Sequence, residues 1–147
     1  MYNSYTISNA LYEQIKNYKD VLSNNYTVEH SEYVNNDPDK TPWVGVYKAP
    51  IVFDPNSLGR HGQSWKGTLA CQVFIQASHG DDAGECSKLL GEMEYNILNA
   101  IWSDPKIDGN ISMITGLEIE YQYNNLKSET LYYQQAVITV TMEKHTG

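Results

Sequence analysis

Residues 65–77, WKGTLACQVFIQA, alternate apolar and polar side chains, and this stretch decides the fold. Such alternation is typical of a β-strand that buries one face and exposes the other. The positions that we expect to face inward are Trp65, Gly67, Leu69, Cys71, Val73, Ile75 and Ala77. Those expected to face outward are Lys66, Thr68, Gln72 and Gln76. The sequence therefore predicts a strand here with one apolar and one polar face.

A long amphipathic helix is predicted directly after this strand. Asp81 or Asp82 is placed to cap its start, and Ser103-Asp104-Pro105 ends it after Trp102. Its apolar residues recur at helical spacing, which indicates that one face packs on the sheet. This face consists of Cys86, Leu89, Leu90, Met93, Ile97, Leu98 and Ile101.

The remaining elements follow from weaker local signals. We expect a first helix capped by Ser8 and ending at about Asn24, and further strands at about 26–34, 42–47, 111–123 and 136–143. In the strand at 111–123 the apolar positions, Met113 among them, alternate with Glu118, Glu120 and Gln122. The predicted fold is α+β, with a single mostly antiparallel sheet of about five strands and two helices packed on one face. The predicted order is α-β-β-β-α-β-β, in one domain that spans residues 1–147. The second face of the sheet is then polar and available for solvent or a partner.

Residues 48–64 show no sustained period and contain Pro50, Pro55, Gly59 and Gly62. We predict a long loop at about 48–64. Loops of this length in compact domains are usually functional or mobile. Arg60 and His61 are the basic pair of this segment, and Lys66 follows closely.

The composition narrows the classes of function. A formal net charge of −8 argues against sequence-independent binding to nucleic acid, which requires clustered cations. No apolar run reaches the ~20 residues of a membrane span, and the first residues carry no secretory signal pattern. Cys71 and Cys86 fall at inward positions, so we expect two reduced, buried thiols and synthesis in a cytoplasm. The twelve tyrosines fit either a protein interface or a tyrosine-rich sheet, and both interpretations stay open.

The search for catalytic chemistry yields one weak candidate. His79, Asp81 and Asp82 lie close together, and imidazole and carboxylates can hold a divalent metal or transfer protons. Aspartate at a helix start is also ordinary capping chemistry, which is the interpretation we favour. His30, between Glu29 and Glu32, is interpreted as a surface histidine. We predict no catalytic residues, no cofactor and no metal site.

The order and spacing of these elements over nearly the whole chain resemble the tail terminator, or tail completion, proteins of long-tailed bacteriophages. The features that carry the resemblance are the short 42–47 strand, the long segment through Arg60 and His61, the alternating strand from Trp65, and the 82–102 helix with its two following strands. The resemblance implies a virion structural protein of the tail–neck region that forms a hexameric ring of identical subunits. It implies that the ring caps the tail tube, joins it to the head connector and lets DNA pass without specific binding. It implies no catalytic residue, and no contact with a membrane is expected.

On this interpretation the subunit or tail-tube interface lies on the loop and the start of the following strand. Its expected residues are Phe53, Leu58, Arg60, His61 and Trp65. Trp65 shares the inward phase of its strand, so a place in the core stays open as well. The alternatives are another neck or head–tail connector protein, a small metal-dependent enzyme using His79, Asp81 and Asp82, and an adaptor domain that binds peptide along a sheet edge.

Overall fold

The computed structural model describes residues 4–30, 35, 37–48, 51–58, 64–80, 82–122 and 132–146, and only the backbone at 38, 51–58, 64, 65 and 146. Its centre is the antiparallel pair formed by β4 (Ser64–His79) and β6 (Tyr132–Thr146). These strands pair without a break from Trp65 opposite Thr146 to His79 opposite Tyr132. The predicted strand of the alternating stretch is therefore present, and the structure places it at the centre of the sheet.

Six strands form one sheet within the described residues. Five of them lie in the order β1-β2-β4-β6-β5, and the sixth, β3, pairs with β4. The strands not yet introduced are β1 (Thr27–His30), β2 (Trp43–Tyr47), β3 (Ile51–Leu58) and β5 (Met113–Gln122). β1 pairs with β2 in parallel and all other pairs are antiparallel. The fold is therefore α+β with a mixed, mostly antiparallel sheet, in agreement with the predicted class.

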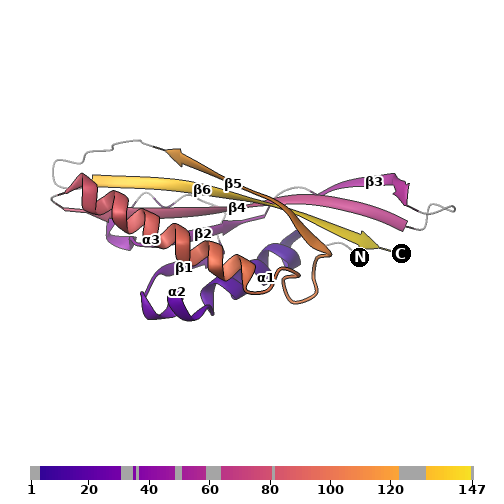
Figure 1. Ribbon diagram of the computed structural model, residues 1–147, viewed down its shortest axis with the longest axis horizontal. Helices are drawn as coiled ribbons and strands as arrows, with labels where there is room; N and C mark the ends of the chain where they lie inside the picture. The colour runs from indigo at the N-terminus through magenta and orange to yellow at the C-terminus, as the bar shows by residue number, and fades with distance from the viewer. Residues whose placement is uncertain are drawn as a thin grey trace.

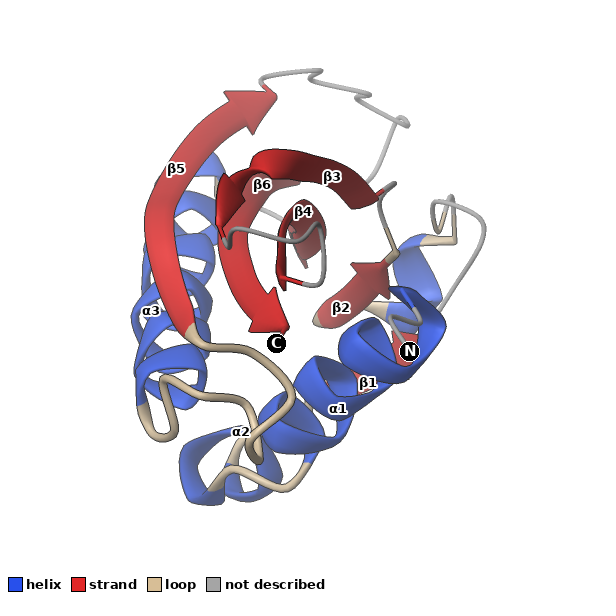
Figure 2. Cartoon of the chain, turned by 90° about the vertical axis from the view of Figure 1, so that its right-hand side faces the viewer, coloured by secondary structure: helices blue, strands red, loops and turns tan. Residues whose placement is uncertain are grey.

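The helices α1 (Ser4–Lys16), α2 (Lys19–Ser23) and α3 (Ala83–Trp102) lie on the same side of the sheet (Figures 1 and 2). The inward side chains of β4 and β6 pack against α1 and α3 in one core. Its largest fully buried members include Leu11, Ile15, Leu69, Ile75, Met93, Ile97, Ile101, Ile138 and Met142. No helix of the described part of the chain is long and apolar enough to cross a membrane.

The first helix departs from its prediction. Ser8 does not cap it but lies inside α1, fully buried. The predicted single helix is also divided, because Tyr18 has an extended backbone (φ −69°, ψ 135°) that separates α1 from α2. The break was missed because the apolar pattern of the sequence continues through it and hides it from a search for helical periodicity.

The predicted loop at 48–64 contains a strand, which is the main correction. β3 pairs with β4 from Ile51 opposite Leu69 to Leu58 opposite Ser64, with a register shift between Asp54 and Leu58. Pro55 falls in that shifted stretch. Proline interrupts central strands but is tolerated at bulges and in edge strands. Its presence in the sequence therefore concealed a real strand.

A second irregularity lies in β5. The register shifts between Ile114 and Gly116, which places Met113 outside the core with 48% of its surface exposed. The sequence assigned Met113 to the apolar face because strict alternation ignores a bulge. Beyond the bulge, Leu117 and Ile119 lie against the core as predicted.

The face of the sheet that points away from the helices is not uniformly exposed to solvent. Gln76, predicted to face solvent, is fully buried and joins a row of amides that crosses three strands. Its Nε2 donates to the Asn35 carbonyl (3.0 Å) and to Gln135 Oε1 (2.6 Å), and its Oε1 accepts from Asn35 Nδ2 (3.1 Å). Gln135 Nε2 donates to Gln122 Oε1 (2.6 Å). Buried amides persist because they satisfy one another.

Trp43 is also fully buried beside this row, opposite Gln76 in the β2–β4 register. Its ring lies over Gly45, where a Cβ would stand 2.1 Å from a ring carbon. Any larger residue at position 45 would therefore displace the indole. Among the described residues, Trp43 Nε1 is the buried side-chain polar atom without a hydrogen-bond partner.

Replacing Gln76 with alanine tests the amide row. The change removes three hydrogen bonds of the row and takes the Gln76 donor away from the buried Gln135 Oε1, so we expect a loss of about 2–3 kcal/mol in the free energy of unfolding. Gln72→Ala, on the same strand but exposed, should stay within about 0.5 kcal/mol of the parent. Urea unfolding of both variants gives the comparison. Equal losses of unfolding free energy in the two variants would show that the amide row contributes no specific stability.

Candidate functional site

The sheet continues beyond the helices as a projecting arm. We define the arm as β3, residues 64–68 of β4 and residues 143–146 of β6. Figure 1 shows these strands extending to one side while α1 and α3 cover the other part of the sheet. The arm arises because β4 and β6 have 16 and 15 residues and their pairing continues past the region that the helices cover.

The predicted interface residues fall largely on this arm. Phe53 lies opposite Gly67 and Leu58 opposite Ser64 in the β3–β4 register, and Trp65 lies opposite Thr146 in the β4–β6 register. The backbone thus brings three of the five predicted residues together on one extension. Arg60 and His61 lie outside the described residues. Their assignment to an interface stays a prediction.

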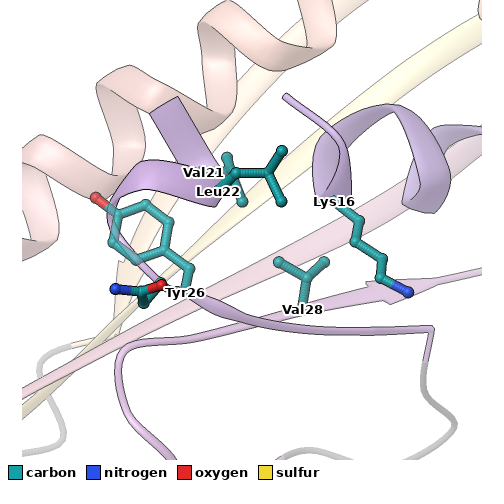
Figure 3. A pocket seen from close by; sticks show the side chains of 6 residues that line it. Lys16, Val21, Leu22, Tyr26 and Val28 are labelled. Carbon is teal, nitrogen blue, oxygen red and sulfur yellow. The ribbon is translucent and has the colours of Figure 1, made fainter. Parts of the chain in front are cut away.

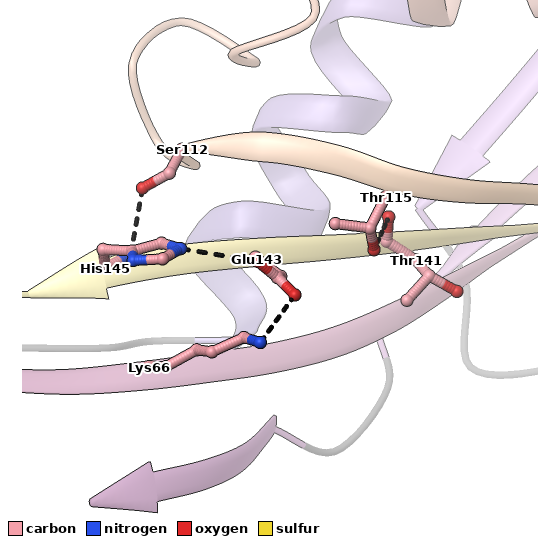
Figure 4. Close-up of polar contacts among 6 residues, drawn as sticks. All are labelled: Lys66, Ser112, Thr115, Thr141, Glu143 and His145. Atoms are coloured by element: carbon pink, nitrogen blue, oxygen red, sulfur yellow. Dashed lines mark hydrogen bonds and ion pairs between the residues drawn. The ribbon is translucent and has the colours of Figure 1, made fainter. Parts of the chain in front are cut away.

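An ionic contact links the strands of the arm (Figure 4). Lys66 Nζ of β4 lies 3.0 Å from Glu143 Oε1 of β6, and His145 Nε2 lies 3.4 Å from Glu143 Oε2. Ser112, next to β5, donates its backbone N–H to the Glu143 carbonyl (2.8 Å), and its Oγ accepts from the His145 backbone N–H (2.9 Å). The three strands are therefore held together where the arm leaves the body. Sequence spacing gave no sign of this contact, because it joins positions far apart along the chain.

The Lys66 hydrogen bond holds the pKa of Glu143 below its ordinary value, and His145 adds to the effect. A carboxylate with a lowered folded-state pKa stabilises the protein above its unfolded-state pKa. This contribution disappears as the pH falls through the folded-state value. The arm is therefore held best at neutral pH and loosens in acid.

We predict that the Glu143→Gln variant loses stability at pH 7 and not in strong acid. The difference in unfolding free energy from the parent should be no more than about 1 kcal/mol, because the pair is partly exposed. This difference in unfolding free energy should be constant above the ordinary pKa of glutamate and should vanish below the lowered pKa of Glu143 in the folded protein. Denaturant unfolding from pH 7 to pH 3 measures this, and a difference that grows in acid would contradict the assignment.

The candidate catalytic cluster is a helix cap. Asp82 is the N-cap of α3, and its Oδ1 accepts hydrogen bonds from the backbone N–H of Gly84 (2.7 Å) and of Glu85 (3.3 Å). His79 Nδ1 accepts from the backbone N–H of Asp82 at 3.1 Å. Asp81 lies outside the described residues. Within the described part of the chain, no three His, Cys, Asp or Glu side chains gather in a way that could hold a metal ion.

Removal of this cap should be a stability effect and not a chemical one. Asp82→Ala is expected to lower the free energy of unfolding by about 1 kcal/mol, whereas Asp82→Ser keeps a capping oxygen and should recover most of it. Thermal denaturation with and without divalent metal checks both variants. If metal stabilised the parent and neither variant, the cluster would be a metal site after all.

His30 is packed more closely than a surface histidine. Its Nε2 lies 2.8 Å from Ser8 Oγ, and its ring lies against the rings of Tyr5 and Tyr12 at centroid distances of 4.9 and 5.8 Å. Ser8 Oγ also donates to the Tyr5 carbonyl (3.1 Å). Because Ser8 is fully buried, this serine–histidine contact offers no access to a substrate. It fastens α1 to the edge strand β1.

The two cysteines match their prediction. Cys71 and Cys86 are free and buried. Cys86 Sγ donates to the Ala77 carbonyl at 3.4 Å, and burial raises the pKa of its thiol. A thiol with a raised pKa is a poor nucleophile at neutral pH, so Cys86 serves packing.

A shallow pocket lies between the end of α1, α2 and β1 (Figure 3), with a volume of about 280 Å³. Its lining residues are Lys16, Val21, Leu22, Asn25, Tyr26 and Val28. Lys16 is the one ionic group among these six, and its ammonium lies 5.4 Å from the centre of the Tyr12 ring. The pocket thus offers apolar contact without a pair of catalytic groups.

Comparison with known proteins adds no relative. No protein-family model matches the sequence, and no curated protein matches it significantly.

Proposed function

We propose that this chain is a virion structural protein: a tail terminator that forms a ring on the end of a phage tail tube and joins the tube to the head connector. The observation that carries the proposal is the arm. A strand extension beyond the body can reach a neighbouring subunit. Contacts between different surfaces of identical subunits generate rings when the rotation closes.

The distribution of charge supports such a contact. The arm carries two cations, Lys66 and Lys144, and two anions, Asp54 and Glu143, for a net charge of zero, and the segment 59–63 between β3 and β4 in the sequence adds Arg60. The whole chain carries −8, so its net negative charge lies on the remaining residues. An arm without net negative charge can approach the acidic body of a neighbouring subunit, whereas two bodies repel. An acidic ring also lets DNA pass without binding it. The self-association is proposed to be hexameric, with a tail tube protein and a neck protein as its other partners.

The charge-reversal variant Arg60→Glu tests the segment between β3 and β4, where we predict part of the interface. We expect a normally folded chain that no longer forms rings or joins tails, with the largest loss at low salt, where screening is weakest. Lys19→Glu makes the same charge change on α2, where the lysine is exposed and away from the arm, and should assemble like the parent. Electron microscopy and sedimentation across a salt series provide the readout. Equal assembly of the two variants would show that this segment is not part of the interface.

The enzymatic alternative gains no support from the geometry of its candidate residues. The Asp82 carboxylate oxygen and the His79 ring nitrogen both accept hydrogen bonds at the start of α3. The alternative of another neck or connector protein uses the same arm and differs only in the partner. Binding to isolated tail tubes separates these two neck functions.

A further inference from the structure

β5 is the last strand on one side of the sheet. In the strand order β1-β2-β4-β6-β5 it pairs with β6, and no other strand of the described residues pairs with its outer edge (Figure 2). In an antiparallel pair, alternate residues turn their backbone N–H and C=O groups away from the partner strand. The outer edge of this ten-residue strand therefore carries a row of backbone donors and acceptors with which a further strand can pair.

The two faces of β5 differ in their side chains. Leu117 and Ile119 lie against the core, and Tyr121 follows them in the same phase with 45% of its surface exposed. Glu118 and Glu120 alternate with these residues and are exposed on the opposite face. A strand added to β5 would thus meet an apolar row on one face and an acidic row on the other.

The acidic row has no neutralising partner in the described sheet. Glu118 lies opposite Thr139 and Glu120 opposite Val137, neither of which carries a charge. Neither glutamate takes part in an ion pair among the described residues. The outer edge of β5 is therefore the side from which the side chains of an added strand can reach both carboxylates.

The same charges decide which strand can occupy the edge. If the β5 strands of two copies paired about Ile119, Glu118 of one copy would lie opposite Glu120 of the other, and like charges directly opposite are destabilising. A strand with lysine or arginine at two alternate positions would instead place a cation beside each carboxylate. No two lysines or arginines of this chain are two residues apart in the sequence. The complementary strand therefore belongs to a different protein.

We propose that the outer edge of β5 binds an extended segment of a partner protein in which basic and apolar side chains alternate. The backbone of this segment pairs with β5, its basic side chains lie beside Glu118 and Glu120, and its apolar side chains lie beside Ile119 and Tyr121. Residues 117–122 of β5 pair with residues 135–140 of β6, outside the arm. The site is therefore separate from the arm and does not depend on the proposed function.

A short synthetic peptide that alternates lysine and valine is the probe, and the same peptide with glutamate in place of lysine is its control. We expect the lysine peptide to bind the full chain and the glutamate peptide to bind about tenfold more weakly or not at all, with the largest difference at low salt. Isothermal titration calorimetry measures both affinities. Equal binding of the two peptides, or binding of neither, would overturn the proposal.

Hydrogen exchange on the complex locates the bound peptide. Backbone amides of β5 should gain protection when the lysine peptide binds, because a paired strand takes up the N–H groups of the outer edge. Amides of β1, at the opposite edge of the sheet, should exchange as in the free chain. Protection of β1, or of neither edge, would contradict strand pairing at β5.

The double variant Glu118→Lys with Glu120→Lys should reverse the preference. We expect it to bind the lysine peptide about tenfold more weakly than the parent and to gain affinity for the glutamate peptide. Glu13→Lys with Glu92→Lys makes the same change of net charge at exposed positions of α1 and α3, and should bind both peptides like the parent. If the β5 variant kept the preference of the parent, or if the helix variant lost it equally, the acidic row would not be the recognition element.

Discussion

The continuous antiparallel pairing of β4 with β6 is the constraint on which the rest of the structure depends. Along one half of this pair, inward side chains such as Val73 and Ile138 form the floor on which α1 and α3 pack. Along the other half the same two strands continue without helices and form the arm. One register therefore sets both the core and the projecting surface. A slip of one residue would turn every apolar side chain of β4 away from the helices.

The features of the fold that the sequence predicted correctly are those that neighbouring residues determine. The alternation of Leu69 to Ala77 and the cap at Asp82 are set by neighbouring residues, and both are present in the structure. The features that it predicted wrongly depend on contacts between residues far apart in the sequence. Gln76 is polar in the sequence but buried, because Asn35 and Gln135 satisfy its amide.

The candidate site shows the same division. Segment 48–64 was predicted as a loop, and its strand was missed because Pro55 is compatible only with an edge or bulged position. The Lys66–Glu143 pair joins two strands that are far apart in sequence, so spacing could not reveal it.

The arm reaches outward from the body and is the surface on which the proposed assembly depends. The central proposal is that the chain acts by forming a ring on a tail tube. Native mass spectrometry of the purified chain, alone and mixed with the proposed tail tubes, tests this proposal most directly. We expect that the chain alone is small and that tubes acquire a ring of six copies at one end. A chain that never exceeds a dimer and leaves the tubes unchanged would contradict it.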